Sequence, residues 1–563
     1  MFTDQQWEAV HASGSNLLIS ASAGSGKTMV LVNRIIEKIK KGTAIDELLV
    51  VTFTNAAAKE MKERIQTAIQ KEINADPDSN TRHHLVAQLP KLGHANISTL
   101  HSFCLKVIER YYYLIDFDPV FRQLTDETEI ELIKEDIWDE ILEEFYTESD
   151  PDFLRFMEAY SGDRSDTKIT QMVFQLHEFS RANENPDEWL SSLSKLYDMS
   201  SGELVKSEIY KKHIKKQWID EFSYMIQLAD QALSLLDGVQ ILEKQYGIIS
   251  SEKQRYIEGL NLIEANELEK LYDFMQDGYK HGTLTGASKK EEYEAERDLF
   301  NDKIKPLRNE AKEVYVKFES NFLMTHDEQV EAIQSTKAYV DILAKMTKEF
   351  ADAYQAYKAN QKLIDFNDLE HLTLRILKGD REGDVSEASH YYRRKFAEVL
   401  VDEYQDINAL QEAILLRLAQ PDEMTGNYFM VGDVKQSIYG FRLADPRLFL
   451  SKYEKYKKGS EGHRIILAEN FRSRDNILSF TNFIFTQLMD EEVGNLIYDK
   501  NAELVYGNKD FTELEGYETE ILIYEKNTEE ELETIESSED NKKNWVKDKA
   551  SGTNHILLTA VQR

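Results

Sequence analysis

Residues 21–28 read Ala21-Ser22-Ala23-Gly24-Ser25-Gly26-Lys27-Thr28. Residues 16–20 before them, with an apolar centre, predict a buried strand, and a helix is predicted from about residue 27 to residue 41. Two glycines let backbone N–H groups approach a phosphate, the lysine supplies positive charge at the β- and γ-phosphates, and the threonine offers a hydroxyl to Mg²⁺. Ala21 stands where glycine is usual. The pattern predicts a phosphate-binding loop, and its flanking strand and helix speak against a chance Gly/Ser turn.

A pair of carboxylates, Asp402 and Glu403, follows the apolar run 399–401 in the second half of the chain. At the end of a buried strand, Asp402 is predicted to hold Mg²⁺ through its water shell, and Glu403 to orient and deprotonate an attacking water. An acidic pair at a strand end is weak evidence alone. Together with residues 21–28, it predicts hydrolysis of a nucleoside triphosphate.

Strands and helices alternate at both ends of the sequence. Residues 48–52 predict a second strand and residues 56–72 its helix, and strands return at 398–402, 428–433 and 464–467. This rhythm predicts an α/β fold with a parallel sheet. Further strands are predicted at 518–524 and 555–561, on either side of a polar, charged segment at 529–549.

Residues 105–362 differ in composition from the rest. They are acidic, poor in Pro and Gly, and rich in Glu, Lys, Leu and Tyr. A large helical insertion is therefore predicted, because apolar side chains recur at helical spacing at Ile130, Ile133, Ile137, Ile141 and Leu142. Mixed charge runs such as 289–292 are interpreted as solvated helix faces.

Composition limits the class of protein. The 563 residues carry a formal net charge of −34, which argues against a generic nucleic-acid coat, although net charge does not say what one groove does. Cys104 is the only cysteine, so an intrachain disulfide or a cysteine-based metal site is excluded and a reducing compartment is indicated. No apolar run has the length of a membrane span and the first residues do not resemble a signal peptide, so we expect a cytoplasmic protein without membrane contact.

Eight segments, in order, resemble the motifs of UvrD/Rep-like superfamily 1 helicases. They are residues 2–6 (the Q motif), 21–28 (motif I), 52–64 (motif Ia), 97–103 (motif Ib), 365–369 (the segment ahead of motif II), 402–406 (motif II), 431–442 (motif III) and 467–473 (motif IV). The resemblance implies a P-loop, RecA-like motor domain with a large helical insertion and the start of a second RecA-like domain. We expect the first motor domain at 1–104 and 363–463, the insertion at 105–362 and the second motor domain from 464 to 563.

The resemblance also implies the ligands, ATP and Mg²⁺, and the residues that bind them. Gln6 would read the adenine, Gln436 would sense the γ-phosphate, and Arg472 would act as an arginine finger. The implied catalytic residues are Lys27, Asp402, Glu403, Gln436 and Arg472, and the implied metal ligands are Thr28 and Asp402. The implied ATP-binding residues are Gln6, Ala21, Ser22, Ala23, Gly24, Ser25, Gly26, Lys27 and Thr28.

Single-stranded DNA is the implied track of the motor. Tyr439 and Phe441 would stack on bases, at about 1–3 kcal/mol per base and without local basic charge. An isolated Phe is more often a core residue, so burial of Phe441 is the alternative. The other implied DNA contacts are Phe53, Asn55, Thr99 and His101.

Residues 20–28 and 101–104 and the long acidic insertion are most similar to the A subunits of AddAB-type (RexAB-type) helicase–nucleases of bacterial double-strand-break repair. That likeness implies 3′ to 5′ movement on single-stranded DNA, entry at duplex ends, a heterodimer with a B subunit and a bacterial cytoplasmic location. No match to motifs V and VI or to a nuclease follows Ser473, so we expect an N-terminal portion of such a protein. The alternative that the chain is a truncated subunit, which binds ATP and DNA without unwinding DNA, remains. A small-molecule kinase is disfavoured, because it needs neither motif III nor Arg472.

Overall fold

The computed structural model describes residues 2–511, except for gaps at 76–77, 163–164, 199–203, 208–209, 279–281, 283, 285–289, 380–383, 422–425, 460–461, 491–493 and 495. The chain forms two compact units. One contains the described residues within 1–130, 181–184 and 358–563, and the other contains those within 131–180 and 185–357. The strands expected at 518–524 and 555–561, and the charged segment between them, lie outside the described residues.

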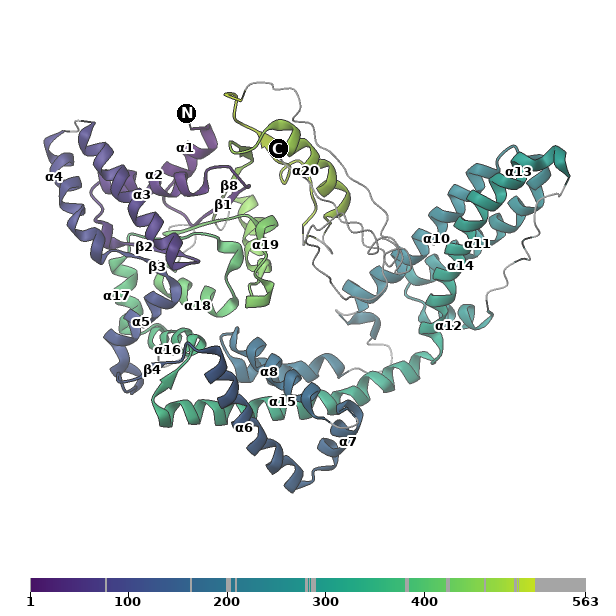
Figure 1. The fold of residues 1–563 in the computed structure, drawn as a ribbon, viewed down its shortest axis with the longest axis horizontal. Helices are drawn as coiled ribbons and strands as arrows, with labels where there is room; N and C mark the ends of the chain where they lie inside the picture. The colour runs from purple at the N-terminus through teal and green to yellow at the C-terminus, as the bar shows by residue number, and fades with distance from the viewer. Residues whose placement is uncertain are drawn as a thin grey trace, which may run out of the picture. The chain divides into compact units, whose positions relative to one another are not determined.

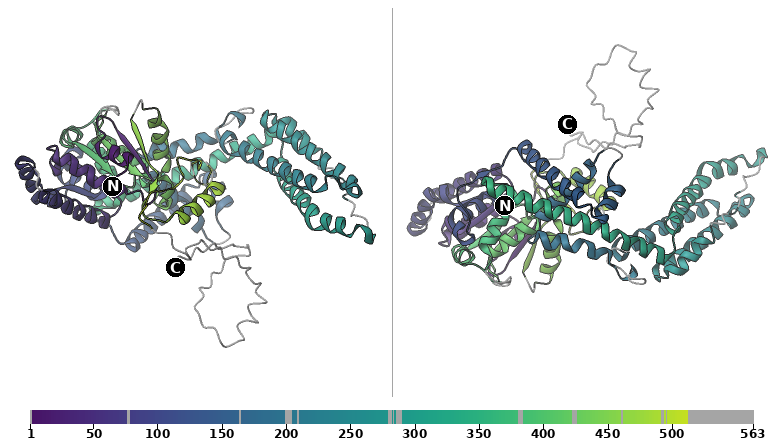
Figure 2. Two further views of the ribbon diagram at one scale, coloured as in Figure 1. Left: turned by 90° about the horizontal axis from the view of Figure 1, so that it is seen from above. Right: turned by 90° about the horizontal axis from the view of Figure 1, so that it is seen from below.

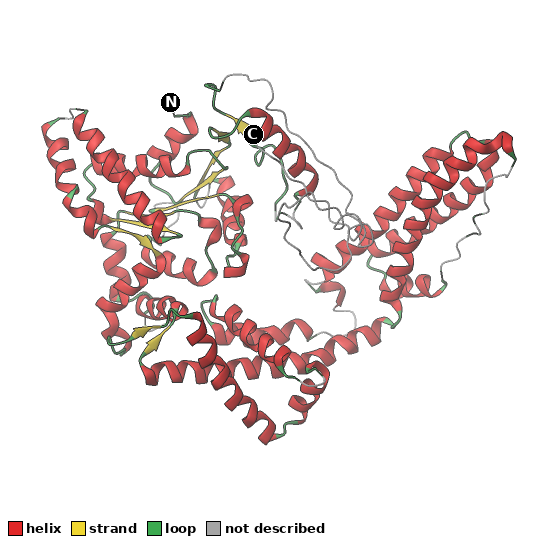
Figure 3. Cartoon of the chain, viewed as in Figure 1, coloured by secondary structure: helices red, strands yellow, loops and turns green. Residues whose placement is uncertain are grey.

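A six-stranded parallel sheet lies at the centre of the first unit (Figures 1 and 3). Its inner strands are apolar and buried, as expected for a parallel sheet that is covered on both faces. The α/β fold class is thereby confirmed. The strand order is β3 (Asn96–Thr99), β2 (Leu48–Thr52), β6 (Glu398–Val401), β7 (Tyr428–Gly432), β1 (Leu17–Ala21) and β8 (His463–Leu467).

Helices cover both faces of this sheet. On one face, α2 (Lys27–Lys40) and α3 (Asn55–Asn74) contribute to a core that includes Ile35, Met61 and Val50. On the other, α5 (Leu100–Tyr111), α16 (Phe366–Leu377) and α18 (Ala409–Leu418) form a second core. The unit also contains α1 (Asp4–His11), α4 (Ser79–Gln88), β4 (Arg122–Gln123), β5 (Leu363–Ile364), α17 (Glu387–Lys395), α19 (Pro446–Lys455), β9 (Glu469–Asn470), α20 (Asp475–Leu488) and β10 (Val505–Tyr506).

Strand β8, which lies at the expected boundary between the two motor domains, belongs to the sheet of the first. We expected residues from 464 onward to open a second motor domain, but β8 pairs with β1 over five residues and completes the first sheet. A second domain would therefore begin after Leu467. The short strand β3 was not predicted, because four residues with three polar side chains give little apolar signal.

The second unit is built from helices, as the spacing of apolar residues predicts. Ile137 and Ile141 of α6 (Glu127–Glu148) lie in one buried cluster with Trp138 and Phe350. A separate cluster is formed where α10 (Lys215–Leu236) packs against α11 (Glu243–Glu264) and α14 (Lys305–Glu319), helices that lie side by side in Figure 2. The remaining long helices are α7 (Pro151–Tyr160), α8 (Thr167–Arg181), α12 (Leu268–Gln276) and α15 (His326–Gln361). Among the helices that the structure describes, none combines the length and apolar character needed to cross a membrane.

A buried charge network anchors the start of α16 in the first unit. The Lys358 Nζ atom donates to Asp365 and to Asp368 at 2.6 Å each, and the Arg181 guanidinium donates to Asp368 at 3.0 Å. The Asp365 side chain also caps α16 by accepting from the Asp368 N–H. Because each buried carboxylate has a cationic partner, the network can be buried without an uncompensated charge.

Acid is expected to destabilise this unit through His371, which contacts the Arg181 carbonyl oxygen at 2.9 Å. Burial and then the positive charge of Arg181 lower the pKa of His371 to about 3. Between about pH 6.5 and 3, the unfolded chain therefore binds one more proton at His371 than the folded chain does. The contribution of His371 to the free energy of unfolding is fully present above pH 6.5. It is lost as the pH falls, by up to about 1.4 kcal/mol per pH unit.

The variant His371→Gln removes the titration and keeps a donor for the carbonyl oxygen. Urea unfolding at pH 7 and pH 5 should show a smaller acid loss for the variant than for the wild-type chain. The exposed His390, changed to Gln, serves as the control and should behave as wild type. Equal acid loss in wild type and His371→Gln would contradict the assignment.

Candidate functional site

The loop at residues 21–28 has the backbone that a phosphate site requires. Gly24 and Gly26 have φ of +70° and +83°, values that residues other than glycine rarely adopt. The Ser25 N–H donates to the Ser22 carbonyl oxygen at 3.1 Å and closes the turn. Helix α2 then begins at Lys27 after Gly26, which provides no side-chain cap. The amides and the positive end of the helix dipole therefore face the loop, an arrangement that favours an anion.

Gln6 fixes this loop from the side of α1. Its Oε1 accepts from the Thr3 N–H at 2.9 Å, and its Nε2 donates to the Ser25 carbonyl oxygen at 2.9 Å. The side chain is buried. In this structure Gln6 thus supports the phosphate loop, and the adenine contact expected of it stays a prediction.

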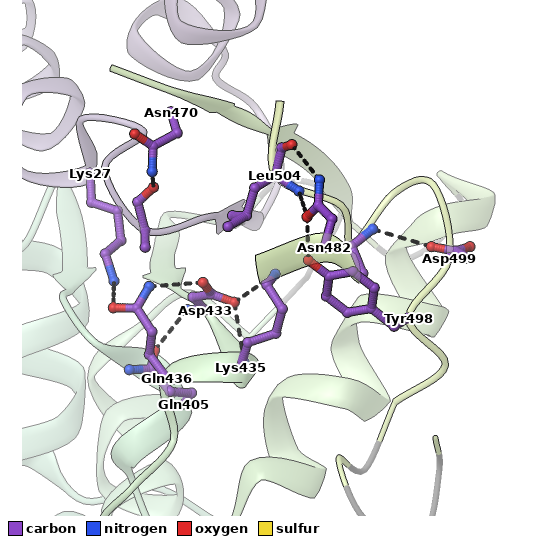
Figure 4. Close-up of polar contacts among 12 residues, drawn as sticks. Lys27, Gln405, Asp433, Lys435, Gln436, Asn470, Asn482, Tyr498, Asp499 and Leu504 are labelled. Atoms are coloured by element: carbon purple, nitrogen blue, oxygen red, sulfur yellow. Dashed lines mark hydrogen bonds and ion pairs between the residues drawn. The ribbon is translucent and has the colours of Figure 1, made fainter. Parts of the chain in front are cut away.

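A closed ring of hydrogen bonds joins motifs I, II and III. The Lys27 Nζ atom donates to Glu403 Oε2 at 2.9 Å and to Gln436 Oε1 at 3.4 Å. The Gln405 Nε2 donates to Glu403 at 2.9 Å, and its Oε1 accepts from the Asp433 N–H at 2.9 Å. The Gln436 Nε2 completes the ring by donating to Asp433 Oδ2 at 2.8 Å (Figure 4). The predicted catalytic residues Lys27, Glu403 and Gln436 therefore meet at one place.

The topology of the sheet explains why these motifs meet. Strands β6, β7 and β1 are neighbours and parallel, so the segments that follow them leave at the same edge. Ligands of open α/β sheets bind at this carboxyl edge. Two backbone features tighten the arrangement. Glu403 adopts a left-handed φ of 51°, a strained conformation that clusters at functional sites, and a Cβ at Gly432 would lie 2.3 Å from Gln405 Oε1.

The carboxylates of motif II are held in an unfavourable environment. Burial and the adjacent Glu403 charge raise the pKa of Asp402 to about 6. Burial and the same charge also raise the pKa of Asp406 to about 6, and one of its oxygens is buried without a hydrogen-bond partner. A bound cation would relieve this excess of negative charge.

The donors at this edge fit Mg²⁺ rather than a transition metal. The Asp402 carboxylate and the Thr28 hydroxyl offer oxygen ligands, and Mg²⁺ is bound through one or two protein ligands together with substrate phosphates. In the part of the chain that the structure describes, no group of three or more His, Cys, Asp or Glu side chains is placed to hold a metal by itself. The residues present fit a cation that arrives with a nucleotide.

Motif IV contacts the phosphate loop directly. The Phe471 N–H donates to the Gly24 carbonyl oxygen at 2.9 Å. The Asn470 Nδ2 donates to the Ala23 carbonyl oxygen at 2.7 Å, and its Oδ1 accepts from the Arg472 N–H at 2.8 Å. The predicted arginine finger therefore starts beside the loop that it would serve.

Aromatic rings gather around one arginine next to motif III. The ring centroids of Phe53 and Tyr439 lie 4.4 Å apart, and those of Tyr439 and Phe441 lie 5.7 Å apart. The Arg442 guanidinium lies 5.5–5.6 Å from all three centroids. Phe441 is 76% exposed, which excludes a core role. An exposed ring beside a cation suits stacking on a base and contact with the charged nucleic-acid backbone.

The other expected DNA contacts form two further groups. Thr99 Oγ1 lies 3.5 Å from Asn55 Oδ1, and it caps α5 by accepting from the Ser102 N–H. His101 instead contacts Glu370, with Nε2 3.1 Å from the carboxylate, and packs edge-on against the exposed ring of Phe366. Thr99 thus caps helix α5, and the DNA contact expected of it stays a prediction.

Several residues of these networks were not predicted. Gln405, Asp433 and Asn470 lie inside quoted motifs, and only the spatial closure of the ring and of the loop shows their contacts. Arg442 follows Phe441 directly, a signal that the sequence did offer. The buried Glu370 carries no local pattern, because its partners His101 and Gln411 come from other helices.

These features define a P-loop nucleotide-binding domain with its acidic and glutamine motifs at the carboxyl edge of a parallel sheet. The family model of the UvrD/REP helicase N-terminal domain matches residues 2–457. The chain belongs to this family.

Similar proteins come from several bacteria. A protein of Enterococcus faecalis, named as the A subunit of an ATP-dependent helicase/nuclease, is 47% identical over 510 residues, covering 90% of this chain and 40% of that protein. Proteins of the same name from Ligilactobacillus salivarius and Anoxybacillus flavithermus are 44% and 42% identical, with 90% of this chain and 40% and 42% of their own lengths covered. The chain spans about two fifths of the length of these relatives.

Proposed function

We propose that this chain hydrolyses ATP in response to single-stranded DNA, as the motor of a DNA helicase. One observation carries the proposal: Lys27, Glu403 and Gln436, from three distant segments, share one hydrogen-bonded ring beside a phosphate-binding loop. ATP brings phosphates that compete with Glu403 for the Lys27 ammonium, so binding would open the ring at this ion pair.

Each residue then has a task that its position permits. Lys27 and the loop amides hold the β- and γ-phosphates. Glu403, released from Lys27, orients a water and accepts its proton, while Gln405 keeps the carboxylate in place. Asp402 and Thr28 would hold Mg²⁺, which neutralises charge on the phosphates when bound. Gln436 lies between Lys27 and Asp433 and would report the presence of the γ-phosphate.

Motif III links the nucleotide to DNA in this proposal. Gln436 belongs to the hydrogen-bonded ring, and Tyr439 and Phe441 follow it within five residues in the aromatic cluster, where Phe441 is exposed. A shift of this short segment when the γ-phosphate leaves would move the stacking rings. Hydrolysis and movement along the strand would thereby be coupled without a long pathway.

The wider role that we propose is based on the names of the similar proteins. The relatives are helicase/nuclease subunits by name, and we propose that this chain acts with a B subunit on duplex ends and single-stranded DNA, moving 3′ to 5′, in double-strand-break repair in the bacterial cytoplasm. Nuclease activity would belong to a longer form. A pull-down with a tagged B subunit from the same organism tests the partnership.

The test of the proposed activity is an ATPase assay on the purified chain with and without single-stranded DNA. Stimulation by DNA is the expected result. A small-molecule kinase would instead leave ATP intact until its own substrate is added, and DNA would have no effect. Nucleotide binding without turnover, in the presence of DNA, would favour a subunit that only binds its ligands.

The variant Phe441→Ala is expected to weaken single-stranded DNA binding by the value of one stacked base, about 1–3 kcal/mol. Because Phe441 is 76% exposed, its removal should leave the melting temperature and the DNA-free ATPase rate unchanged. Fluorescence anisotropy with labelled oligothymidylate measures the affinity. Tyr113, 56% exposed on the same unit, provides the control as Tyr113→Ala, which should bind DNA as wild type. Wild-type affinity in Phe441→Ala would exclude the stacking role.

A further inference from the structure

The side chain of Asn470 joins the phosphate loop to the backbone of Arg472. Its Nδ2 donates to the Ala23 carbonyl oxygen at 2.7 Å (Figure 4). Its Oδ1 accepts from the N–H groups of Arg472 and Ser473, at 2.8 Å each. The Asn470 side chain is buried, with 3% of its surface exposed, and its three bonds are partly shielded from water.

The absence of a side chain at Gly24 leaves room for the Asn470 amide. A Cβ at Gly24 would lie 2.8 Å from both polar atoms of the Asn470 amide and 2.9 Å from the Cβ of Arg472. Gly24 is therefore needed for close approach as well as for its positive φ. The Phe471 N–H adds a parallel bond to the Gly24 carbonyl oxygen. Motif IV thus lies directly against the loop at residues 23–24.

We propose that Asn470 is a positioning residue that sets the place of Arg472 relative to the phosphate loop. An arginine finger contributes only if its guanidinium reaches the charge that develops on the transferred phosphoryl group. One planar amide that holds both the loop carbonyl and the Arg472 N–H fixes the base of the Arg472 side chain against the loop. This inference rests on the proposed ATP hydrolysis and names a residue on which that chemistry depends.

The test compares two nucleotide complexes of the whole chain by fluorescence titration. Mant-ADP with Mg²⁺ measures ground-state binding, and mant-ADP with Mg²⁺ and aluminium fluoride mimics the phosphoryl group in transfer. Asn470→Ala is expected to weaken binding of the aluminium fluoride complex about 10- to 100-fold. A complete arginine contact contributes about 10³–10⁵-fold to the rate, and a misplaced Arg472 would lose part of this contribution. Binding of mant-ADP alone should change less than about threefold, because Lys27 and the loop amides remain.

A double-mutant cycle separates positioning from general stability. If Asn470 acts through Arg472, the double variant Asn470→Ala/Arg472→Ala should bind the aluminium fluoride complex no more weakly than Arg472→Ala alone. Additive losses would overturn the proposal. The matched control is Asn482→Ala, which removes three comparable bonds, to the Leu504 backbone and to Tyr498, away from the loop (Figure 4). It should bind both complexes as wild type.

Asn470→Asp covers the case in which Asn470→Ala does not fold. It keeps the oxygen that accepts from Arg472 and Ser473, and it replaces the donor to Ala23 with a charged acceptor that repels the carbonyl oxygen. It should therefore lose affinity for the aluminium fluoride complex as Asn470→Ala does. Wild-type affinity of either variant for that complex would overturn this inference alone. A wild-type chain that binds no nucleotide would overturn the proposed function, and this inference with it.

Discussion

The variant Glu403→Gln is expected to bind ATP as tightly as the wild-type chain and to hydrolyse it about 10²–10⁴-fold more slowly, the usual contribution of a general base. The amide keeps the shape of the carboxylate and still accepts from Lys27 and Gln405, so the ring around it should persist. Only the ability to take a proton from water is lost. A DNA-stimulated phosphate-release assay measures the rate, and fluorescent ATP measures the affinity.

The exposed Glu109 of α5, changed to Gln, is the control and should hydrolyse ATP at the wild-type rate. Hydrolysis by Glu403→Gln at the wild-type rate would show that another group is the base. Asp406 would then be the next residue to test, because one of its oxygens is buried and unpartnered and its pKa is raised to about 6.

Lys27→Ala is expected to lose both affinity and turnover. The phosphates lose their main countercharge, and a hydrogen bond to a charged group is worth about 1.5–3 kcal/mol, or roughly 10- to 100-fold in affinity. Turnover should fall further, by about 10³-fold or more, because the charge on the transferred phosphoryl group grows in the transition state. The variant also leaves Glu403 without its cation and with Gln405 as its remaining partner in the ring.

Fluorescent ATP binding and phosphate release, measured on the same preparation, separate the two effects of Lys27→Ala. Lys41→Ala, exposed at the other end of α2, removes an equal charge and should change neither. Retention of turnover within tenfold of wild type would contradict a role for Lys27 at the γ-phosphate.

Much of the sheet could be predicted because its strands are short apolar runs that adjoin Gly-rich or acidic motifs. Strand β2 was predicted with its observed bounds, and β1, β6 and β7 to within a residue at either end. The place of β8 could not be predicted, because a buried strand of one sheet and the first strand of the next have the same apolar pattern. Only pairing with β1 distinguishes the two.

The sequence could indicate which residues come together at the site, but not the hydrogen bonds that connect them. Residue types identify Lys27, Asp402 and Glu403, because phosphate, Mg²⁺ and water each require a particular group. The amides of Gln6, Gln405 and Asn470 are chemically neutral, and their bonds to backbone atoms depend on where loops from distant segments come to lie. The contact of His101 could not be predicted either, because its buried partner Glu370 comes from another helix.

The ion pair between Lys27 and Glu403 joins residues 376 positions apart, and this distance affects biosynthesis. At about 5–20 residues per second, a ribosome needs roughly 20–75 s to make the chain between them. During this interval β1 and β2 have emerged while their neighbours β7 and β6 are not yet made, so both nascent strands keep open edges. The helices of the intervening segment contact one another locally and can fold first, which shortens the effective loop that the late strands must close. Molecular chaperones are therefore most needed between synthesis of residue 52 and residue 432, and destabilising substitutions in β6 or β7 should reduce the soluble yield more than equal ones in β2.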